Sequence, residues 1–321
     1  SAEGGVGTVG LEDVLGVDFS TLGGIKDVVE KLNEIGQILL KRYHMVISGK
    51  RYWVVEVEAY LYSQNHQDLF THQDDLQRET SGNWYFHRQG KTKKTFKGGS
   101  FMGLDITMGK AGLNTGGLLI RSIADVRSGE VIEGPCNVVK KVLELTKQKS
   151  LQALHDWERF HLNAFQQGNS VSLKASSNQR QCTVIGSPRY GLSLKGDGKA
   201  KEKWIMAPYR FISEPRDVKR QRSLTALSLW LTEKDLTDSK IKDITGIALK
   251  MLDGHRQEFL SGIEEDMSEY HGRGLKAKDL VRMYGAWTKE YGSLFGLEWD
   301  PRTSDKLVLD QPANDYELQS F

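Results

Sequence analysis

The stretch Arg51–Leu61, which reads RYWVVEVEAYL, decides the fold. β-Branched and aromatic residues dominate it, and its residues alternate between two faces, which predicts a β-strand. The two sets are Trp53, Val55, Val57 and Ala59 on one face, and Val54, Glu56, Glu58 and Tyr60 on the other. Glutamate is a poor strand former, so two glutamates on one face indicate either a solvated face or a functional site.

The segments on either side of this strand predict further strands and helices. Upstream, apolar residues recur every three or four positions from Ile25 to Leu39, which predicts a helix, and a β segment around Leu39–Ser48 follows. Downstream, helices are predicted from Gly134-Pro135 and over roughly 150–167. The strand-like runs are 83–88, 100–108, 116–125 and 181–212.

The C-terminal part of the chain has a different pattern. Helical periodicity recurs in Leu224–Leu231, Ile241–Met251, Phe259–Tyr270 and Ala277–Leu297. We divide the chain into a flexible lead (1–20), an α+β domain (21–215), a helical extension (216–300) and a polar tail (301–321).

Composition and charge narrow the classes of protein. Of the 321 residues, 38% are hydrophobic and 27% charged, which is typical of a globular protein. The 44 basic and 42 acidic side chains leave a net charge of +2, so the bulk charge identifies no partner. No apolar run is long enough to span a membrane, and the first residues do not resemble a signal peptide. With only two cysteines, we expect a reducing, intracellular compartment, nuclear or cytoplasmic.

The histidines and glycines form no cofactor motif. His66, His72 and His87 fall within 22 residues, but no third close ligand pair, H-E-x-x-H or C-x-x-C accompanies them. The glycines around 98–117 lack the dinucleotide-binding spacing, and no Walker or G-x-S-x-G motif occurs. We therefore expect no metal and no cofactor, and we interpret these histidines as donors that line a pocket.

One segment is strongly basic. The run RQGKTKKTFK contains five positive charges and no acid, with an aromatic residue among them. A hairpin of this composition can lie on nucleic-acid phosphates, although it can also be an ordinary solvated loop. The residues concerned are Arg88, Lys91, Lys93, Lys94, Phe96 and Lys97.

Several short segments, each weak alone, occur in a specific order. They are Glu56-Val57-Glu58-Ala59-Tyr60-Leu61, then Asp68 and His72, Gly82–His87, Leu104-Asp105-Ile106, Leu118–Ser122, Gly134-Pro135, Ser187–Leu192 and Pro208–Phe211. In this order the run from Ile25 to Phe211 resembles the alkyladenine (3-methyladenine) DNA glycosylase family. The resemblance implies a curved, mainly antiparallel sheet with flanking helices, to which the helical extension is added.

The resemblance also implies roles for individual residues. Glu58 would activate a water that Arg121 also holds, and this water would attack the anomeric carbon as the glycosidic bond breaks. The remaining residues would form the base pocket. They are Tyr60 and His87, which stack on the flipped base, His72, which contacts the base or the backbone, Tyr85, whose side chain we expect to face the other way, and Asp105.

The sequence also departs from the family pattern. His87 stands where the family has a stacking tyrosine, and Asp105 stands where it has a base-discriminating asparagine. The hairpin that carries the family's intercalating tyrosine is replaced by the longer, basic Gln89–Gly99, in which Phe96 is the substitute wedge. An aspartate accepts hydrogen bonds only, so the preferred base is expected to differ.

The expected function is therefore hydrolysis of an N-glycosidic bond in nucleic acid, with DNA favoured and RNA as an alternative. A second hypothesis is a hydrolase of free nucleosides or nucleotides, in which the basic loop binds a phosphate. A third is a nucleic-acid-binding or partner-docking protein with weak catalysis. The helical extension is a candidate surface for a protein partner or for self-association, and no membrane partner is expected.

Overall fold

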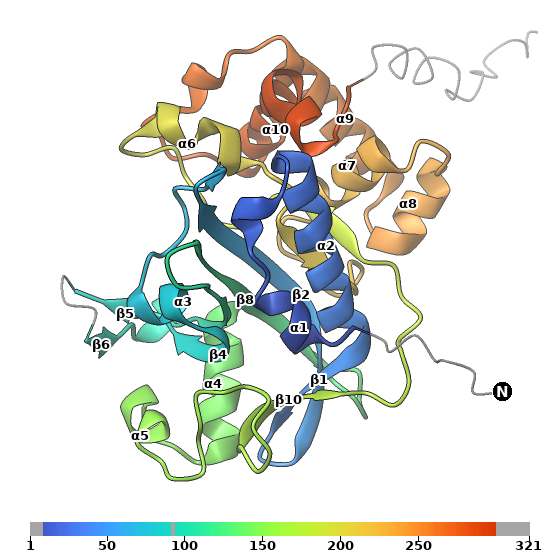
Figure 1. Ribbon diagram of the computed structural model, residues 1–321. Helices are drawn as coiled ribbons and strands as arrows, with labels where there is room; N and C mark the ends of the chain where they lie inside the picture. Colours follow the sequence, from blue (N-terminus) through green and yellow to red (C-terminus); the bar gives the residue numbers. More distant parts are fainter. Residues whose placement is uncertain (1–8, 91–93, 300–321) are drawn as a thin grey trace, which may run out of the picture.

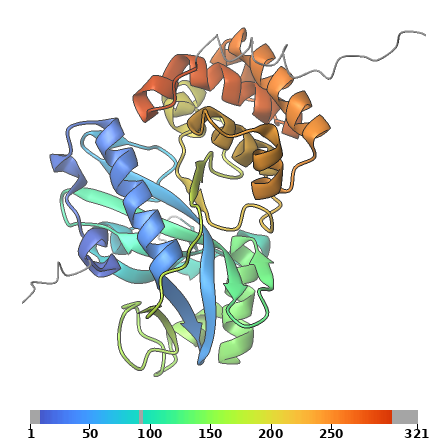
Figure 2. The ribbon, with the colours of Figure 1, turned by 90° about the vertical axis from the view of Figure 1, so that its right-hand side faces the viewer.

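The computed structural model describes residues 9–90 and 94–299 (Figure 1). The polar tail at 301–321 and the basic residues Lys91 and Lys93 lie outside the described residues. Figures 1 and 2 show a β-sheet with helices packed around it, and the C-terminal helices gathered over one end of it.

A large antiparallel sheet forms the centre of the fold. Its main path is β10-β1-β2-β8-β7-β4, and every strand pairing in the described residues is antiparallel. These strands are β1 (Tyr43–Ile47), β2 (Lys50–Ser63), β4 (Ser81–Phe86), β7 (Leu104–Met108), β8 (Asn114–Asp125) and β10 (Val171–Ala175). Short strands β3 (His66–Gln67), β9 (Val131–Glu133), β11 (Ile185–Ser187) and β12 (Arg210–Ile212) extend it, and β5 (Arg88–Gln89) pairs separately with β6 (Thr95–Phe96). The predicted α+β class with a mainly antiparallel sheet is confirmed.

The helices lie before, between and after these strands. The first group is α1 (Leu11–Leu15), α2 (Ile25–Arg42), α3 (Asp75–Glu79), α4 (Pro135–Thr146), α5 (Leu151–His155) and α6 (Gly198–Ile205). The C-terminal helices are α7 (Arg222–Thr232), α8 (Asp238–Thr245), α9 (Leu249–Ile263) and α10 (Ala277–Tyr291). Single turns of 3₁₀ helix are η1 (Phe19–Thr21), η2 (Gly99–Phe101), η3 (Met267–Tyr270) and η4 (Gly292–Phe295). None of the helices in the described residues is both long and apolar enough to cross a membrane.

The start of α4 confirms the sequence prediction. Proline at the first position of a helix loses no hydrogen bond, because the N–H of that position has no partner within the helix. Pro135 occupies this position, and Gly134 before it adopts a φ of 102°, which favours glycine.

The long pair β2 and β8 contains two compensating bulges. Val54 faces Ile123 and Val57 faces Ile120, but between them Glu56 faces Ser122, so Val55 and Arg121 have no partner in the ladder. Each bulge interrupts the alternation of side chains, so residues on the two sides of the bulge point to the opposite faces from those that strict alternation predicts. Val54 therefore shares the main core with Val57, whereas Val55 packs in a small separate cluster with Ile212. The predicted strict alternation along Arg51–Leu61 is thus wrong at Val55, because a bulge adds one residue to the strand.

One continuous hydrophobic core joins the sheet to the C-terminal helices. The helix α2 packs so closely on β12 that a Cβ at Gly36 would lie 2.8 Å from the Phe211 ring. At the other end, Trp287 and Phe295 pack against each other, and Phe295 also contacts the rings of Trp204 and Tyr209. Most buried apolar residues of the helical extension therefore belong to this core, and a small separate cluster is formed by Ala226, Ile241, Ile247 and Leu252.

Several predicted element boundaries are wrong, because contacts with distant parts of the chain decide where these elements begin and end. Ordered structure begins before Thr21, since Leu11 of α1 and Phe19 of η1 are fully buried. The helix expected over 150–167 ends at His155, and beyond it Asn169 holds a loop by hydrogen bonds to His161 and Asn163.

Two further boundaries also differ. The β region expected from 181 to 212 contains the helix α6, whose N-terminus is capped by Asp197. The helical run Ile241–Met251 breaks at Gly246, which has a φ of 70° and ends α8.

Candidate functional site

Cross-strand pairing places the predicted site residues on one face of the sheet. Arg210 of β12 faces Glu58 of β2, Glu58 faces Leu119 of β8, Leu119 faces Asp105 of β7, and Asp105 faces Tyr85 of β4. Directly opposed residues project to the same side of a sheet. Glu58 and Asp105 are two strands apart, a separation of about 10 Å between their backbones.

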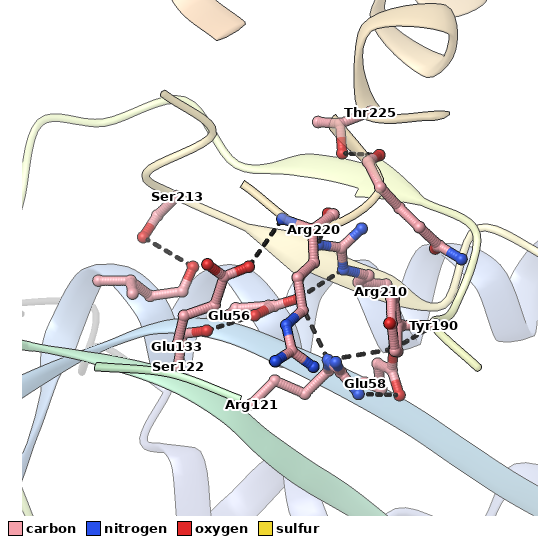
Figure 3. A network of polar contacts seen from close by, with 12 residues as sticks. Glu56, Glu58, Arg121, Ser122, Glu133, Tyr190, Arg210, Ser213, Arg220 and Thr225 are labelled. Carbon is pink, nitrogen blue, oxygen red and sulfur yellow. Dashed lines mark hydrogen bonds and ion pairs between the residues drawn. The ribbon is translucent and has the colours of Figure 1, made fainter. Parts of the chain in front are cut away.

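Glu58 is fully buried and both of its carboxylate oxygens accept hydrogen bonds. The Tyr190 main-chain N–H donates to Oε1 at 2.6 Å, and the Tyr60 hydroxyl donates to Oε2 at 2.8 Å. Arg121 contributes a longer contact, from Nη1 to Oε2 at 3.5 Å (Figure 3). Glu58 is therefore held by one cation, one phenol and one main-chain group from three different segments.

Arg121 reaches this cluster because it is a bulge residue of β8. Its Nε lies 3.2 Å from Glu56 Oε1 and 3.4 Å from Glu58 Oε1, so one guanidinium bridges both carboxylates. The Tyr190 ring packs over it, with the guanidinium carbon 4.8 Å from the ring centre. Burial alone would lower the pKa of Arg121, but Glu58 and Glu56 outweigh burial and raise it, so Arg121 is cationic.

Glu56 has a different set of partners. Arg210 Nε donates to Glu56 Oε1 at 2.6 Å, and the Ser122 hydroxyl donates to Oε2. Burial favours the neutral acid, but Arg210 and Arg121 outweigh burial and lower the pKa of Glu56. We call Glu56, Glu58, Arg121 and Arg210 the carboxylate cluster.

A second buried ion pair supports the cluster from the side. Arg189 donates to Asp68 Oδ2 at 2.6 Å and also to the carbonyl oxygens of Ala59 and Trp204. Its guanidinium carbon lies 4.5 Å from the centre of the Tyr60 ring. Burial, and after it Glu58, raise the pKa of Tyr60 well above its ordinary value, so its hydroxyl remains a donor. Asp68, one of the residues that carry the resemblance, thus anchors the segment that carries Tyr190.

Among the histidines, His66 belongs to the core. Its ring contacts Tyr209 at 2.6 Å and the Leu61 carbonyl at 3.0 Å. Burial lowers its pKa to about 4, so it is neutral at pH 7. No group of three or more histidine, cysteine or carboxylate side chains within the described residues could hold a metal ion.

Two strands away from Glu58, polar and aromatic side chains surround Asp105. His87 Nε2 lies 2.8 Å from Asp105 Oδ1, and Gln77 Nε2 donates to Oδ2 at 2.7 Å. The His87 ring centre lies 5.1 Å from that of His72 and 6.0 Å from that of Tyr85. The expectation that Tyr85 faces the other way is therefore wrong, because residues two apart on a strand share a face. We call Asp105, His87, Tyr85, His72 and Gln77 the aspartate group.

The basic hairpin lies close to the aspartate group. His87 directly precedes β5, and its main-chain carbonyl accepts a hydrogen bond from Lys97 at 2.8 Å. Phe96, expected to be a wedge, packs its ring against Phe86 and His155 and is only partly exposed. The large exposed apolar side chain here is Phe101 in η2, which is 75% exposed. Sequence reasoning did not single out Phe101, although its position after Gly98-Gly99 marks a tight, projecting turn.

Sequence reasoning also assigned no role to Arg210 or Tyr190. Both lie in segments that carry the resemblance, Pro208–Phe211 and Ser187–Leu192, so the signal was present. Contacts across more than 130 residues, such as Tyr190 with Glu58, cannot be read from local spacing.

The geometry defines an α+β protein with a buried carboxylate–arginine cluster on the polar face of an antiparallel sheet. The chain belongs to the same family as "Uncharacterized protein L759" of Acanthamoeba polyphaga mimivirus. The two are 32% identical over 203 residues, which are 60% of this chain and 89% of the viral protein. No protein-family model and no solved structure matches the sequence.

Proposed function

We propose that this protein hydrolyses an N-glycosidic bond in nucleic acid, with Glu58 as the base that activates water. The proposal rests above all on one observation. Glu58, Leu119 and Asp105 lie opposite one another on neighbouring strands, so the aspartate group lies two strands away from Glu58 on the same face of the sheet. In this proposal the sugar lies beside Glu58, and the base lies against Asp105, His87 and Tyr85. The resemblance of the ordered segments to alkyladenine DNA glycosylases supports the same assignment.

The proposed chemistry needs a carboxylate that is ionised but has free basicity. Glu58 accepts a proton from water, the water oxygen bonds to the anomeric carbon, and the electrons of the C–N bond leave with the base. Arg121 lies against Glu58 as its cationic partner, and the Glu58 carboxylate stabilises the positive charge that develops on the sugar. The departing base takes up a proton from solvent or from a donor at its edge.

Water must reach Glu58 before this step. In the structure, Glu58 Oε1 accepts the Tyr190 N–H, so a water that takes this position must displace the Tyr190 segment. Arg189 anchors that segment through Asp68, while Gly191 adopts a φ of 76° on its other side. We propose that substrate entry moves Tyr190 away from Glu58 and that the anchor at Arg189 stays in place.

The nucleic acid would be held at the hairpin next to the aspartate group. Arg88, Lys94 and Lys97 carry positive charge there, and we propose Phe101 in place of Phe96 as the side chain that wedges into the base stack. A wedge needs an exposed apolar ring, and Phe101 provides one where Phe96 does not.

Mass spectrometry of released bases tests the proposal. Wild-type protein is incubated with mixed oligonucleotides, single-stranded and duplex, and separately with nucleosides and nucleotides. We expect free base from oligonucleotides, and a loss of about 10²–10⁴ in rate for Glu58→Gln, as general-base removal typically costs. Glu144→Gln, a surface glutamate on α4, is the matched control and should keep the wild-type rate.

The other outcomes separate the remaining hypotheses. Base released only from nucleosides or nucleotides would replace the proposal by a small-molecule hydrolase. Absence of any released base, with oligonucleotide binding retained, would leave a binding protein. Equal rates for Glu58→Gln and wild type would remove Glu58 as the base.

A further inference from the structure

A cavity of about 900 Å³ lies between the segment that carries Tyr190 and the C-terminal helices. One wall is formed by residues 189–193 and Lys195, and the other walls come from α7, the start of α9 and α10. We call it the junction cavity. Its volume is in the range of small-molecule sites, which typically enclose about 300–1,000 Å³.

The charge of the lining residues is one-sided. The lining includes Lys195, Lys219, Arg220, Arg222 and Arg273 but no aspartate or glutamate. Within the described residues, Lys195, Lys219 and Arg220 form no side-chain ion pair with a carboxylate. Arg273 is paired with Asp279, and the Glu133 carboxylate accepts the Arg220 main-chain N–H, but no described acidic residue lines the concave surface itself. An excess of cations around a concave surface attracts an anion.

Main-chain N–H groups at the cavity wall also favour a negatively charged ligand. The helices α7 and α9 begin at the cavity wall, with Gln221 and Ala248 as their N-cap residues. Neither N-cap side chain accepts a hydrogen bond from the first turn, so N–H groups at two helix N-termini remain available to an anion.

Several of the other lining residues are apolar. Ile205, Met206 and Met283 are almost fully buried at the cavity wall, and Leu280 lies beside them. A simple inorganic anion would leave this surface unused. The ligand should therefore combine an anionic part with an apolar or aromatic body.

We propose that the junction cavity binds a nucleoside phosphate, with the phosphate on Lys219, Arg220 and the N-termini of α7 and α9, and the base on the apolar wall. The nucleotide is either free or the end of a nucleic-acid strand, because both present the same chemistry. The cavity adjoins the carboxylate cluster, because Tyr190 lines the cavity and donates its main-chain N–H to Glu58. Occupation of the cavity by a nucleotide does not require Glu58 to be catalytic.

Isothermal titration calorimetry tests the proposal on the full chain. The probes are ATP, adenosine and a 5′-phosphorylated ten-nucleotide thymidine strand. We expect one ATP per chain, and at least about tenfold weaker binding of adenosine, since charge-assisted contacts to the phosphate are lost. The double variant Lys219→Ala/Arg220→Ala should weaken ATP by a similar factor. Lys140→Glu, an exposed change on α4 outside the cavity, is the charge control and should not weaken it.

The variant Ala248→Asp is expected to raise the stability of the protein and to lower its affinity for ATP. An aspartate at this N-cap position caps α9 and should raise the thermal midpoint, yet it takes the N–H groups and repels the phosphate. Weaker ATP binding in a more stable protein supports the site. The proposal is overturned if ATP does not bind, or if it binds the double variant and Ala248→Asp as tightly as wild type.

Competition identifies the source of the phosphate. If the strand displaces ATP and the double variant weakens both, the site binds strand ends. If the strand does not displace ATP, the site binds free nucleotide. Calorimetry measures ATP binding and not base release, so a failure of the proposed glycosidic activity would leave the outcome of this test unchanged.

Discussion

The two glutamates of the carboxylate cluster are equally buried, but their contacts hold them to different degrees. Glu56 and Glu58 lie two residues apart on β2, and neither is exposed to solvent. Glu56 is held by two guanidinium groups and a hydroxyl, all from residues fixed in the sheet. Glu58 is held by a phenol, a main-chain N–H of a loop and a 3.5 Å contact with Arg121.

This difference is the one we expect between a structural carboxylate and the carboxylate proposed as the base. The ion pairs of Glu56 stabilise its charged form and make it a weak base. Two of the three Glu58 partners are neutral donors, and one belongs to a segment outside the main sheet path. The predictions below test this distinction, in order of expected size.

The largest effect is expected for Glu56→Gln on stability. Removing one partner of a buried ion pair leaves Arg210 without its carboxylate and typically costs about 3–5 kcal/mol. Glu58→Gln should cost about 1–2 kcal/mol, because Arg121 keeps Glu56 as a partner. Urea unfolding followed by circular dichroism measures both values. Equal destabilisation would contradict the distinction between the two carboxylates.

A second effect concerns the stability of the protein in acid. The pKa of Glu56 is lower in the folded protein than in the unfolded chain. Its contribution to stability is therefore complete above the unfolded pKa and is lost as pH falls through the folded pKa. Each unit of difference contributes about 1.4 kcal/mol.

Unfolding free energies measured from pH 7 to pH 3 check this effect. We expect the wild-type value to fall below about pH 4.5, where a free glutamate begins to protonate, and the Glu56→Gln value to fall less over the same window. Parallel curves for the two proteins would show that Glu56 does not carry the acid sensitivity.

A smaller effect is expected for Tyr60→Phe. This change deletes only the hydroxyl that donates to Glu58, and a hydrogen bond to a charged group typically contributes about 1.5–3 kcal/mol. We expect the low end of that range, because Glu58 keeps two other contacts. Tyr62→Phe is the control, since within the described residues the Tyr62 hydroxyl has no hydrogen-bond partner. Unfolding in urea should distinguish the two variants.

The smallest change in free energy is expected for Asp105→Asn, and it concerns base preference. Asparagine restores the family's residue and adds a donor where Asp105 only accepts. Because His87 and Gln77 both contact Asp105, we expect a modest loss of stability and a shift of the released base towards those of the family. A panel of oligonucleotides with different modified bases measures the shift. An unchanged preference would place Asp105 outside the base pocket.

The sequence correctly predicted the elements that depend on a regular spacing of apolar residues or on a short motif. The strand Arg51–Leu61, the helix from Ile25 and the Pro135 helix start are of this kind. The order of segments, read as a resemblance, also brought together Glu58, Tyr60 and Arg121. Each of these rests on a repeat of two or 3.6 residues or on a short motif.

Features that depend on distant partners were not predicted. The bulge at Arg121 has no local signature, because it is defined by the pairing of two strands. The partners Tyr190 and Arg210 approach Glu58 and Glu56 only after the chain has closed around the sheet. The junction cavity combines residues from both halves of the chain, so no window of sequence contains its charge pattern.

The paired bulges of β2 and β8 have a consequence for how this family can change by insertion and deletion. Each strand carries one extra residue at the same level, Val55 and Arg121, and the register is the same on both sides of the pair. Loss of Val55 alone would leave β2 one residue short and turn half of its side chains to the wrong face. Loss of both would restore a regular ladder but remove the bridging guanidinium. Relatives that keep the Glu56–Glu58 spacing should therefore gain or lose these two positions together, as a covarying pair of single-residue gaps.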